Sequence, residues 1–333
     1  MGTGPSFGRC RPQHRTRGAR VYTRRVHVET TRLARLRALE LSPAAFRRIA
    51  AATAFALWLI VATGAVVRLT SSGLGCEHWP GCEPGRPFPE KDYHAYIEFG
   101  NRMVGGVTIA LTLALAVGAR LTRGLPRWVK WLAGATFVGT LAQAPLGAIT
   151  VYAHLHPALV IPHLLLSIAV LGSAIVVGVE SISLGRGHGR PLGREPRLAG
   201  LGIGAAALAL IATGSIATAA GPHSGGEKVY RLWSLHPALL LHGAAVAVLG
   251  CSLMFLIGYL FARRATAQRY FVWAVGLAGA VLVQMALGDI QYRTHLPWWL
   301  VLVHVAVAAT VWAWTVALVT MMWRPPAVVD GST

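Results

Sequence analysis

Charged residues are scarce in this sequence. Only 13% of its 333 residues are Asp, Glu, Lys or Arg, whereas 54% are hydrophobic. Soluble domains average about 25% charged residues, so this composition excludes an ordinary soluble protein. The lipid bilayer is therefore the expected environment of the chain.

Long apolar runs are what the sequence has instead. Each is about twenty residues long, enough to cross roughly 30 Å of hydrocarbon as a helix. We therefore predict an all-α membrane protein with eight transmembrane helices. The runs cover residues 49–67, 96–119, 131–149, 158–179, 198–219, 236–262, 271–288 and 298–322.

The formal net charge of +19 would suit a nucleic-acid partner, but the positions of the basic residues favour a membrane topology. They cluster after every second apolar run, which by the positive-inside rule places those loops and both termini in the cytoplasm. We therefore expect no nucleic-acid partner, and membrane lipid around the helices. Arg68, Arg102 and Arg231 lie towards the outer side against this trend, so they are candidates for a specific role. The cytoplasmic clusters are Arg120, Arg123, Arg127 and Lys130; Arg186, Arg190, Arg194 and Arg197; and Arg263, Arg264 and Arg269.

The first 48 residues contain twelve arginines and no apolar core. A cleaved signal peptide needs a hydrophobic stretch, so we expect none in this segment. Residues 1–48 are interpreted as a basic, solvated cytoplasmic tail, with contact to anionic lipid as the alternative. No chemistry is assigned to the tail.

The sequence repeats itself over three helices. A shift of 141 positions superposes Gln143 on Gln284 and His154 on His295. We expect these two histidines to cap equivalent helix entries. The same shift superposes Leu146 and Gly147 on Leu287 and Gly288, Leu159 and Val160 on Leu300 and Val301, and His163 on His304.

The first span repeats with a different shift, of 150 positions, which superposes residues 62–64 on 212–214. Four spans per repeat is an even number, so both repeats enter the membrane in the same direction. We predict two parallel four-helix halves, and parallel halves argue against an inverted-repeat transporter. The expected organisation is a first half at 49–180, a cytoplasmic linker at 181–197, a second half at 198–323 and a tail at 324–333.

Four equivalent polar positions lie inside the apolar runs, namely Asn101, His163, His242 and His304. All fall early in helices that run from outside to inside, so they share one depth near the outer leaflet. The second and fourth helices of such a bundle are diagonal, so His242 and His304 can face each other. A porphyrin fits between them, with both imidazoles on its iron. A lone intramembrane histidine is more often only hydrogen-bonded, but the recurrence favours ligands. Zinc or copper would need further close ligands that the spans lack.

Glu98 is the only carboxylate well inside the second run, three residues before Asn101 and so on the same helical face. Its repeat mate is Leu239. Two interpretations stay open. Glu98 either forms an i,i+4 ion pair with Arg102 or serves as a general acid or base in the first half.

Two of the four cysteines, Cys76 and Cys82, share the first outer loop. On the oxidising side of the membrane a disulfide persists, so we predict one that staples this loop. A CxxxxxC pair without added histidines is a poor zinc signature. Cys10 and Cys251 are interpreted as inert.

Several stretches together resemble the haem A synthases of the cytochrome oxidase assembly pathway. They cover the region from about 49 to 322 and leave out the arginine-rich tail. The Cys-containing stretch and the last one are the most specific. They are ATGAVVRLTSSGLGCEHWPGC at 62–82, IEFGNR at 97–102, QAPLGAITV at 143–151, GPHSG at 221–225 and GDIQYRTHLPWWLVLVH at 288–304.

The resemblance implies a division of labour between the halves. The second half would hold a haem b cofactor between His242 and His304. The first half would take haem O, with His163 as axial ligand and Glu98 as catalytic carboxylate, and oxidise the C8 methyl group to a formyl by successive hydroxylations. The sequence departs from the family at Asn101, where the usual residue is a histidine. That departure leaves open whether His163 alone holds the substrate or whether Asn101 contributes through a water.

The resemblance also implies the surroundings of the reaction. The expected location is the plasma membrane of a bacterium, and a haem O synthase is the expected donor of substrate. Arg68 and Arg102 are expected to hold the propionates of the substrate haem. The main rival is a bis-histidine cytochrome b that carries electrons from quinol without modifying haem. The electron acceptor, a homo-oligomeric state and redox cycling of the cysteine pair stay open.

Overall fold

The computed structural model describes residues 1, 2, 4, 40–76, 81, 82, 85, 88, 89, 92–221, 231 and 233–327. The chain divides into Met1–Glu40 and a compact unit that begins at Leu41. The expectations for the arginine-rich tail up to residue 39, for Cys10, for residues 222–225 of GPHSG and for residues 328–333 lie outside the described residues.

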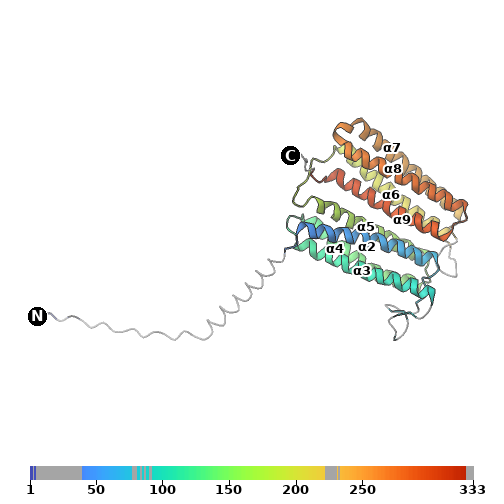
Figure 1. Ribbon diagram of the computed structural model, residues 1–333, viewed down its shortest axis with the longest axis horizontal. Coiled ribbons are helices and arrows are strands. Elements are labelled where there is room, and N and C mark those ends of the chain that lie inside the picture. Colours follow the sequence, from blue (N-terminus) through green and yellow to red (C-terminus); the bar gives the residue numbers. More distant parts are fainter. Residues whose placement is uncertain are drawn as a thin grey trace. The chain divides into compact units, whose positions relative to one another are not determined.

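The compact unit is a bundle of long helices (Figure 1). Within the described residues eight helices are long and apolar enough to cross a membrane. The predicted all-α membrane fold with eight transmembrane helices is therefore confirmed. The helices are α2 Pro43–Leu69, α3 Tyr93–Leu121, α4 Arg127–Tyr152, α5 Pro157–Ile182, α6 Arg194–Ala220, α7 Leu235–Ala262, α8 Arg264–Arg293 and α9 Trp298–Trp323.

Local capping sets where the helices begin. The first span begins at Pro43 rather than near residue 49, because the side chain of Ser42 accepts a hydrogen bond from the Ala45 amide at 3.2 Å and Pro43 suits the first helical position. Asp92 caps α3 in the same way, accepting from the Ala95 amide at 3.0 Å. Polar residues just outside the apolar runs therefore lengthen the spans beyond their hydrophobic cores.

The helices form two rings of four. Helices α2, α3, α4 and α5 contact one another in that cyclic order, and so do α6, α7, α8 and α9. Among the described residues α3 does not contact α5, and α7 does not contact α9, so each of these pairs is diagonal. This arrangement is compatible with the predicted pair of four-helix halves. Helix α9 also contacts α2 and α5 of the first ring.

The turns before α5 and α9 have the same unusual backbone. His154 and Leu155 have φ of 50° and 58°, and His295 and Leu296 have 62° and 59°, in the left-handed region that these residue types rarely adopt. The amides of Leu155 and Leu296 donate to the carbonyls of Thr150 and Gln291, repeat-equivalent residues, at 2.9 and 2.7 Å. Both helices therefore enter the membrane through the same strained turn.

Our expectation that His154 and His295 cap these helices is wrong. The N-cap residues are His156 for α5 and Pro297 for α9, two positions further along the chain. Since proline has no side-chain oxygen or nitrogen to offer, only His156 accepts a capping hydrogen bond, from the Ala158 amide at 3.3 Å. His154 and His295 take up the left-handed turn that precedes the caps.

The tightly packed core lies at the arginine-rich end of each ring. In the first ring it includes Phe46, Leu115, Val129 and Val177, and in the second it is built around residues 249–260 of α7. Asn101, His163, His242 and His304 belong to none of these buried clusters, and all four are half-buried. The four equivalent polar residues therefore lie beyond the solid core, towards the opposite end.

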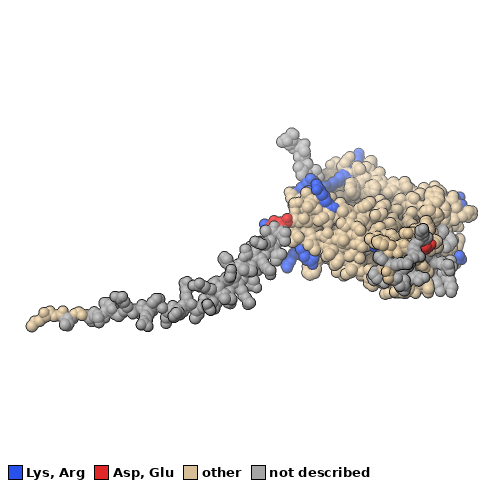
Figure 2. Space-filling model, turned by 60° about the horizontal axis from the view of Figure 1, so that its bottom comes forward, with Lys and Arg blue, Asp and Glu red and all other residues tan. Residues whose placement is uncertain are grey.

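The distribution of charge agrees with a membrane orientation. Figure 2 shows blue atoms gathered at the end of the bundle where α2 begins, while its long flank carries almost no charged atoms. The α2–α3 loop with Cys76 and Cys82 lies at the opposite end of the helices, because α2 runs from one end to the other.

Tryptophans join the two rings. Trp58 of α2 donates its indole N–H to the Ala306 carbonyl of α9 at 3.1 Å, and Trp312 of α9 donates to the Ile168 carbonyl of α5 at 2.8 Å. A buried apolar cluster that includes Leu57, Leu171 and Ala309 surrounds these contacts. The indole groups thus find partners where lipid and packed side chains offer no water.

A buried carboxylate ties the rings together at the arginine-rich end. Glu180, at the end of α5, is 2% exposed and accepts from Arg324, which follows α9. His188 of the connecting segment lies 3.1 Å from the second carboxylate oxygen. The backbone of Gly189 also donates to the Pro325 carbonyl at 2.8 Å. The segment after α5 and the segment after α9 are therefore held together by an ion pair and by backbone hydrogen bonds.

We predict that Arg324→Leu lowers the free energy of unfolding by roughly 2 kcal/mol, because it leaves the buried Glu180 carboxylate with only His188 beside it among the described residues. The loss is smaller than the ~3–5 kcal/mol of a fully buried pair since Arg324 is partly exposed. Thermal unfolding in detergent measures the effect. The double variant Arg324→Leu/Glu180→Leu should recover much of it, and Arg293→Leu, which breaks the exposed pair with Asp289, should change little. A double variant less stable than Arg324→Leu would contradict this account.

Candidate functional site

His242 is held by a threonine of the neighbouring helix. The Thr213 hydroxyl on α6 lies 3.2 Å from Nδ1 of His242 on α7. The same hydroxyl donates to the carbonyls of Ala209 and Leu210, each at 3.0 Å, so it is free to accept from Nδ1–H. A histidine whose Nδ1 carries the proton presents the lone pair of Nε2 to a metal.

His304 lies on α9, diagonally across the second ring from His242. Its backbone carbonyl accepts a hydrogen bond from Nε2 of Gln284 on α8 at 2.9 Å. Its ring Nδ1 is buried and has no hydrogen-bond partner among the described residues. Two histidines on facing helices, one of them with an unsatisfied buried nitrogen, suit a group bound between them.

Glycines leave room for both imidazoles. A Cβ added to Gly214 would lie 3.0 Å from Cε1 of His242, and a Cβ added to Gly288 would lie 3.2 Å from Cε1 of His304. Both distances are shorter than ordinary van der Waals contact. The edge of each ring therefore packs against a helix backbone that lacks a side chain at that point. This close packing restricts the rotation of the rings and suits axial ligation of a haem.

The first ring repeats half of this arrangement around His163. Gln143 on α4 donates to the His163 carbonyl at 3.2 Å, and a Cβ on Gly147 would lie 3.5 Å from Cε1 of the ring. Nδ1 of His163, like that of His304, is buried without a partner among the described residues. His163 is thus presented as His304 is, on the equivalent helix and from the equivalent side.

The opposite position of the first ring differs. Thr63 of α2, which is equivalent to Thr213, donates to Oδ1 of Asn101 at 2.8 Å. A Cβ added to Gly64 meets nothing within 4 Å, whereas the equivalent Gly214 is in contact with the His242 ring. Asn101 and His242 therefore have equivalent threonine partners. Because the asparagine side chain is shorter, the space beside Gly64 that an imidazole would fill stays open.

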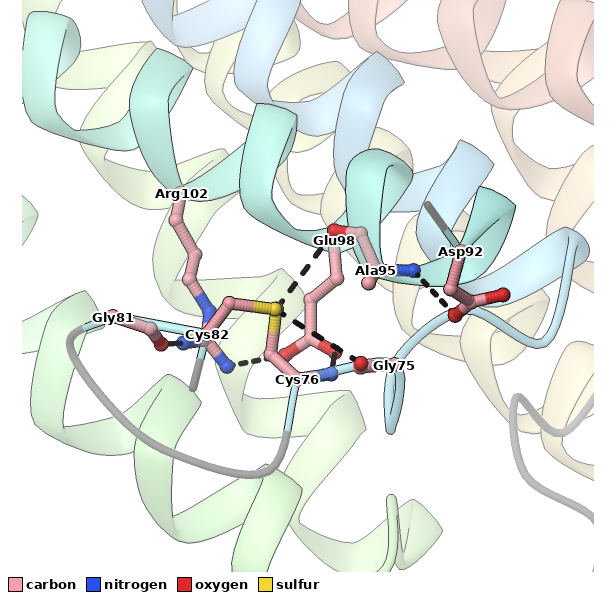
Figure 3. The surroundings of a disulfide bond; sticks show 8 residues. All are labelled: Gly75, Cys76, Gly81, Cys82, Asp92, Ala95, Glu98 and Arg102. Carbon is pink, nitrogen blue, oxygen red and sulfur yellow. Dashed lines mark hydrogen bonds and ion pairs between the residues drawn. A yellow bond between two sulfur atoms is a disulfide. The ribbon is translucent and has the colours of Figure 1, made fainter. Parts of the chain in front are cut away.

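Glu98 lies at the centre of the contacts around the disulfide (Figure 3). It is 4% exposed, and one carboxylate oxygen accepts from the Cys76 amide at 2.9 Å. The other forms the predicted ion pair with Arg102, which also donates to the Gly81 carbonyl. The ion pair is confirmed, and it comes with a second partner that the sequence did not indicate. Glu98 thus connects α3 to the loop above the first ring.

The predicted disulfide between Cys76 and Cys82 is confirmed. Both residues are buried, and the adjoining Gly75 lies so close to α3 that a Cβ there would be 2.6 Å from the backbone of His94. A glycine is therefore required at Gly75 for the loop to approach the helix. Cys251 is free and exposed on α7, and no interaction suggests a role for it.

The outer arginines differ in their surroundings. Arg102 is engaged by Glu98 and Gly81, as described above. Arg68, in the last turn of α2, has its Nε buried without a hydrogen-bond partner among the described residues. Arg231 is exposed. Of the two residues expected to hold propionates, Arg68 is the one with a buried guanidinium nitrogen, Nε, that has no hydrogen-bond partner among the described residues.

Comparisons with known proteins indicate the family of the chain. A family model described as "Cytochrome oxidase assembly protein" matches residues 47–92 and 87–225. A protein named heme A synthase from Symbiobacterium thermophilum is 28% identical over 269 residues, which cover 74% of this chain and 87% of that protein. Heme A synthases from Bacillus pumilus and Bacillus licheniformis are 39% and 38% identical over 109 and 100 residues. These two matches cover 32% and 30% of this chain but only 35% and 33% of the relatives.

The chain belongs to the haem A synthase family. The matched family model begins within α2 and ends just beyond α6, so it includes both Glu98 and His163 but neither His242 nor His304. The alignment with the Symbiobacterium protein is long enough to need parts of both rings. The roles of individual residues stay predictions.

Several residues of this haem A synthase family member were not singled out by sequence as supports of the site. They are Thr63 and Thr213, Gln143 and Gln284, and the four glycines beside them. The signal was present, since all of them belong to repeated motifs. The repeat showed that these residues are equivalent, but it did not show which of them contact the histidines and Asn101.

We predict that Gly214→Ala weakens haem retention by the second half, because its Cβ would press on the His242 ring. The repeat-matched control is Gly64→Ala, whose Cβ meets open space and should leave the same signal unchanged. Haem content of the purified variants, measured by the pyridine haemochrome spectrum, checks the difference. Equal haem content in both variants would show that Gly214 is not needed to accommodate the His242 imidazole.

Proposed function

We propose that the protein is a haem A synthase, an oxidoreductase that converts the C8 methyl group of haem O to a formyl group by successive hydroxylations. The observation that carries the proposal is the asymmetry of two otherwise matched rings. One ring has two histidines with equivalent supports, and the other has one histidine, an asparagine and a buried carboxylate. Membership of the haem A synthase family supports the same reaction.

The second ring is the cofactor half in this proposal. His242 and His304 would hold a haem b, oriented by Thr213 and by the glycines against which the rings pack. A haem with two histidine ligands is coordinatively closed and supplies electron transfer. The residues of this half provide ligation and exclude water, and no carboxylate lies beside the histidines in the described part of α7 or α9.

The first ring is the substrate half. His163 would be the axial ligand of haem O, and Arg68 would pair with a propionate because its buried Nε lacks a partner. Glu98 would accept the proton that the methyl group releases when an electron acceptor takes two electrons from the substrate, or orient the water whose oxygen is then added to that carbon. Its contacts with Cys76 and Arg102 hold the carboxylate in one orientation, which suits a group that must act at a single carbon atom.

The protein would work in the bacterial plasma membrane with both termini in the cytoplasm. The basic residues between α3 and α4 and between α5 and α6 support this orientation, which places the disulfide on the oxidising side. Haem O would come from a haem O synthase. We assign no electron acceptor. A cytochrome b that only carries electrons from quinol would account for the second ring. It would not account for the buried Glu98 or for the disulfide loop of the first ring.

We predict that the purified protein shows a low-spin b-type spectrum and that His242→Ala or His304→Ala removes it, because each takes away one axial ligand. His163→Ala is the matched control in the other ring, and it should keep the low-spin spectrum while lowering haem A. A His304→Ala protein with an unchanged spectrum would contradict the pairing.

We predict that Glu98→Gln retains haem b but makes little haem A, with haem O or a hydroxylated intermediate accumulating. Loss of a general acid or base typically lowers a rate by about 10² to 10⁴. Extraction and chromatography of haems from cells that also produce a haem O synthase measures the outcome.

Arg102→Gln separates catalysis from support of the loop. It removes the ion pair but leaves the Glu98 carboxylate and its hydrogen bond from the Cys76 amide. A catalytic Glu98 predicts that Glu98→Gln is much the more damaging of the two in correctly inserted, haem b-loaded protein. Equal defects would reduce Glu98 to a residue that only positions the loop.

A further inference from the structure

We propose that the substrate haem of this protein has one histidine ligand and an exchangeable position on its other face, where Asn101 donates a hydrogen bond to a small ligand. The class of ligand is a water molecule or a diatomic such as carbon monoxide or cyanide. The proposal rests on the proposed function, since it assumes that haem O binds at His163. It concerns a feature of this chain, in which Asn101 occupies a position equivalent to His242.

The hydrogen bond from Thr63 decides which end of the Asn101 side chain is free. Thr63 donates to Oδ1 at 2.8 Å, so the amide oxygen of Asn101 is turned towards α2. The remaining Nδ2 group makes no hydrogen bond to any described residue, and an amide nitrogen has two N–H donors and no lone pair suited to a metal. Asn101 therefore offers a donor to the site rather than a ligand atom.

The space beside Asn101 is the second argument. The His242 ring lies against Gly214, but nothing lies within 4 Å of a Cβ placed on the equivalent Gly64. The first ring thus keeps the glycine that accommodates a histidine and lacks the histidine. No other described His, Cys, Asp or Glu joins His163 in a group of three that would hold a metal ion. A small ligand has room where the imidazole would be.

The His163 side of the same site is unchanged between the rings. Its carbonyl is held by Gln143 and its ring packs against Gly147, as His304 is held by Gln284 and packs against Gly288. One face of the substrate is therefore ligated as in the second ring, and only the other face is open. In haem proteins a hydrogen-bond donor on the open face governs which small ligands bind.

Carbon monoxide distinguishes the two rings in one sample. The purified protein carrying haem b is reduced without oxygen, which prevents turnover, and titrated with haem O in the presence of carbon monoxide. We expect no carbon monoxide complex before haem O is added, because the cofactor has both histidines. Near-stoichiometric formation of the complex should follow each addition of haem O. In the absence of carbon monoxide the added haem should be high-spin.

Two variants test the two parts of the proposal. Asn101→His should place an imidazole over Gly64, make the added haem O low-spin and abolish its carbon monoxide complex. Asn101→Leu should still bind carbon monoxide but raise its infrared stretching frequency, because the donor is lost. His163→Ala is the control that should prevent ligation of added haem O while haem b is retained.

The outcomes separate this proposal from the proposed function. Haem O that binds in a low-spin form inert to carbon monoxide would overturn the open position while leaving the substrate half intact. An unchanged stretching frequency in Asn101→Leu would overturn the hydrogen bond from Asn101. Failure of the wild-type protein to bind haem O at all would overturn the substrate site, and this proposal with it.

Discussion

The structure depends on how an imidazole is held inside a membrane, where no water can satisfy or reorient it. Each ligand position takes two things from the preceding helix, a hydrogen-bonding side chain and a glycine. Thr213 and Gly214 serve His242, and Gln284 and Gly288 serve His304. Thr213 contacts the imidazole of His242, whereas Gln284 donates to the backbone carbonyl of His304, so at both positions the glycine is what restricts the imidazole. The helices must then pack closely at these points, and this close packing determines the spacing between neighbouring helices.

The two halves differ at only a few of these supporting positions. The first ring keeps Thr63 and Gly64 although Asn101 has replaced the histidine that such a pair accommodates. What it has gained is Glu98, whose contacts reach upward to Cys76 rather than across the ring. The two rings therefore differ in the side chains that α3 and α7 place at this point, while both offer a threonine to that position from the preceding helix. The disulfide loop above the first ring is held by the Glu98 carboxylate.

The spans and the disulfide could be predicted because each leaves a local signal: a run of apolar residues, or two cysteines in one loop. The ligand positions are inferred from a fixed shift between the halves and stay predictions. Contacts between distant segments left no local signal. The ties from Glu180 to Arg324 and from Glu98 to the Cys76 amide depend on how helices meet, which no spacing encodes. His154 and His295 were misplaced as caps because each lies only two or three residues before a proline, where a helix is expected to begin; both take up the left-handed turn instead, and the cap is the residue just before the helix.

Helix α9 follows the other seven described helices along the chain, and both rings depend on contacts that it makes. It carries His304, supplies the carbonyl that Trp58 requires, and is followed by Arg324, the partner of the buried Glu180. Until it inserts, the first ring lacks its neighbour, the second ring is open on one side, and Glu180 of α5 lacks its arginine. Insertion of α9 therefore closes the second ring, brings His304 into it and completes the contacts of Trp58 and Glu180 in a single step.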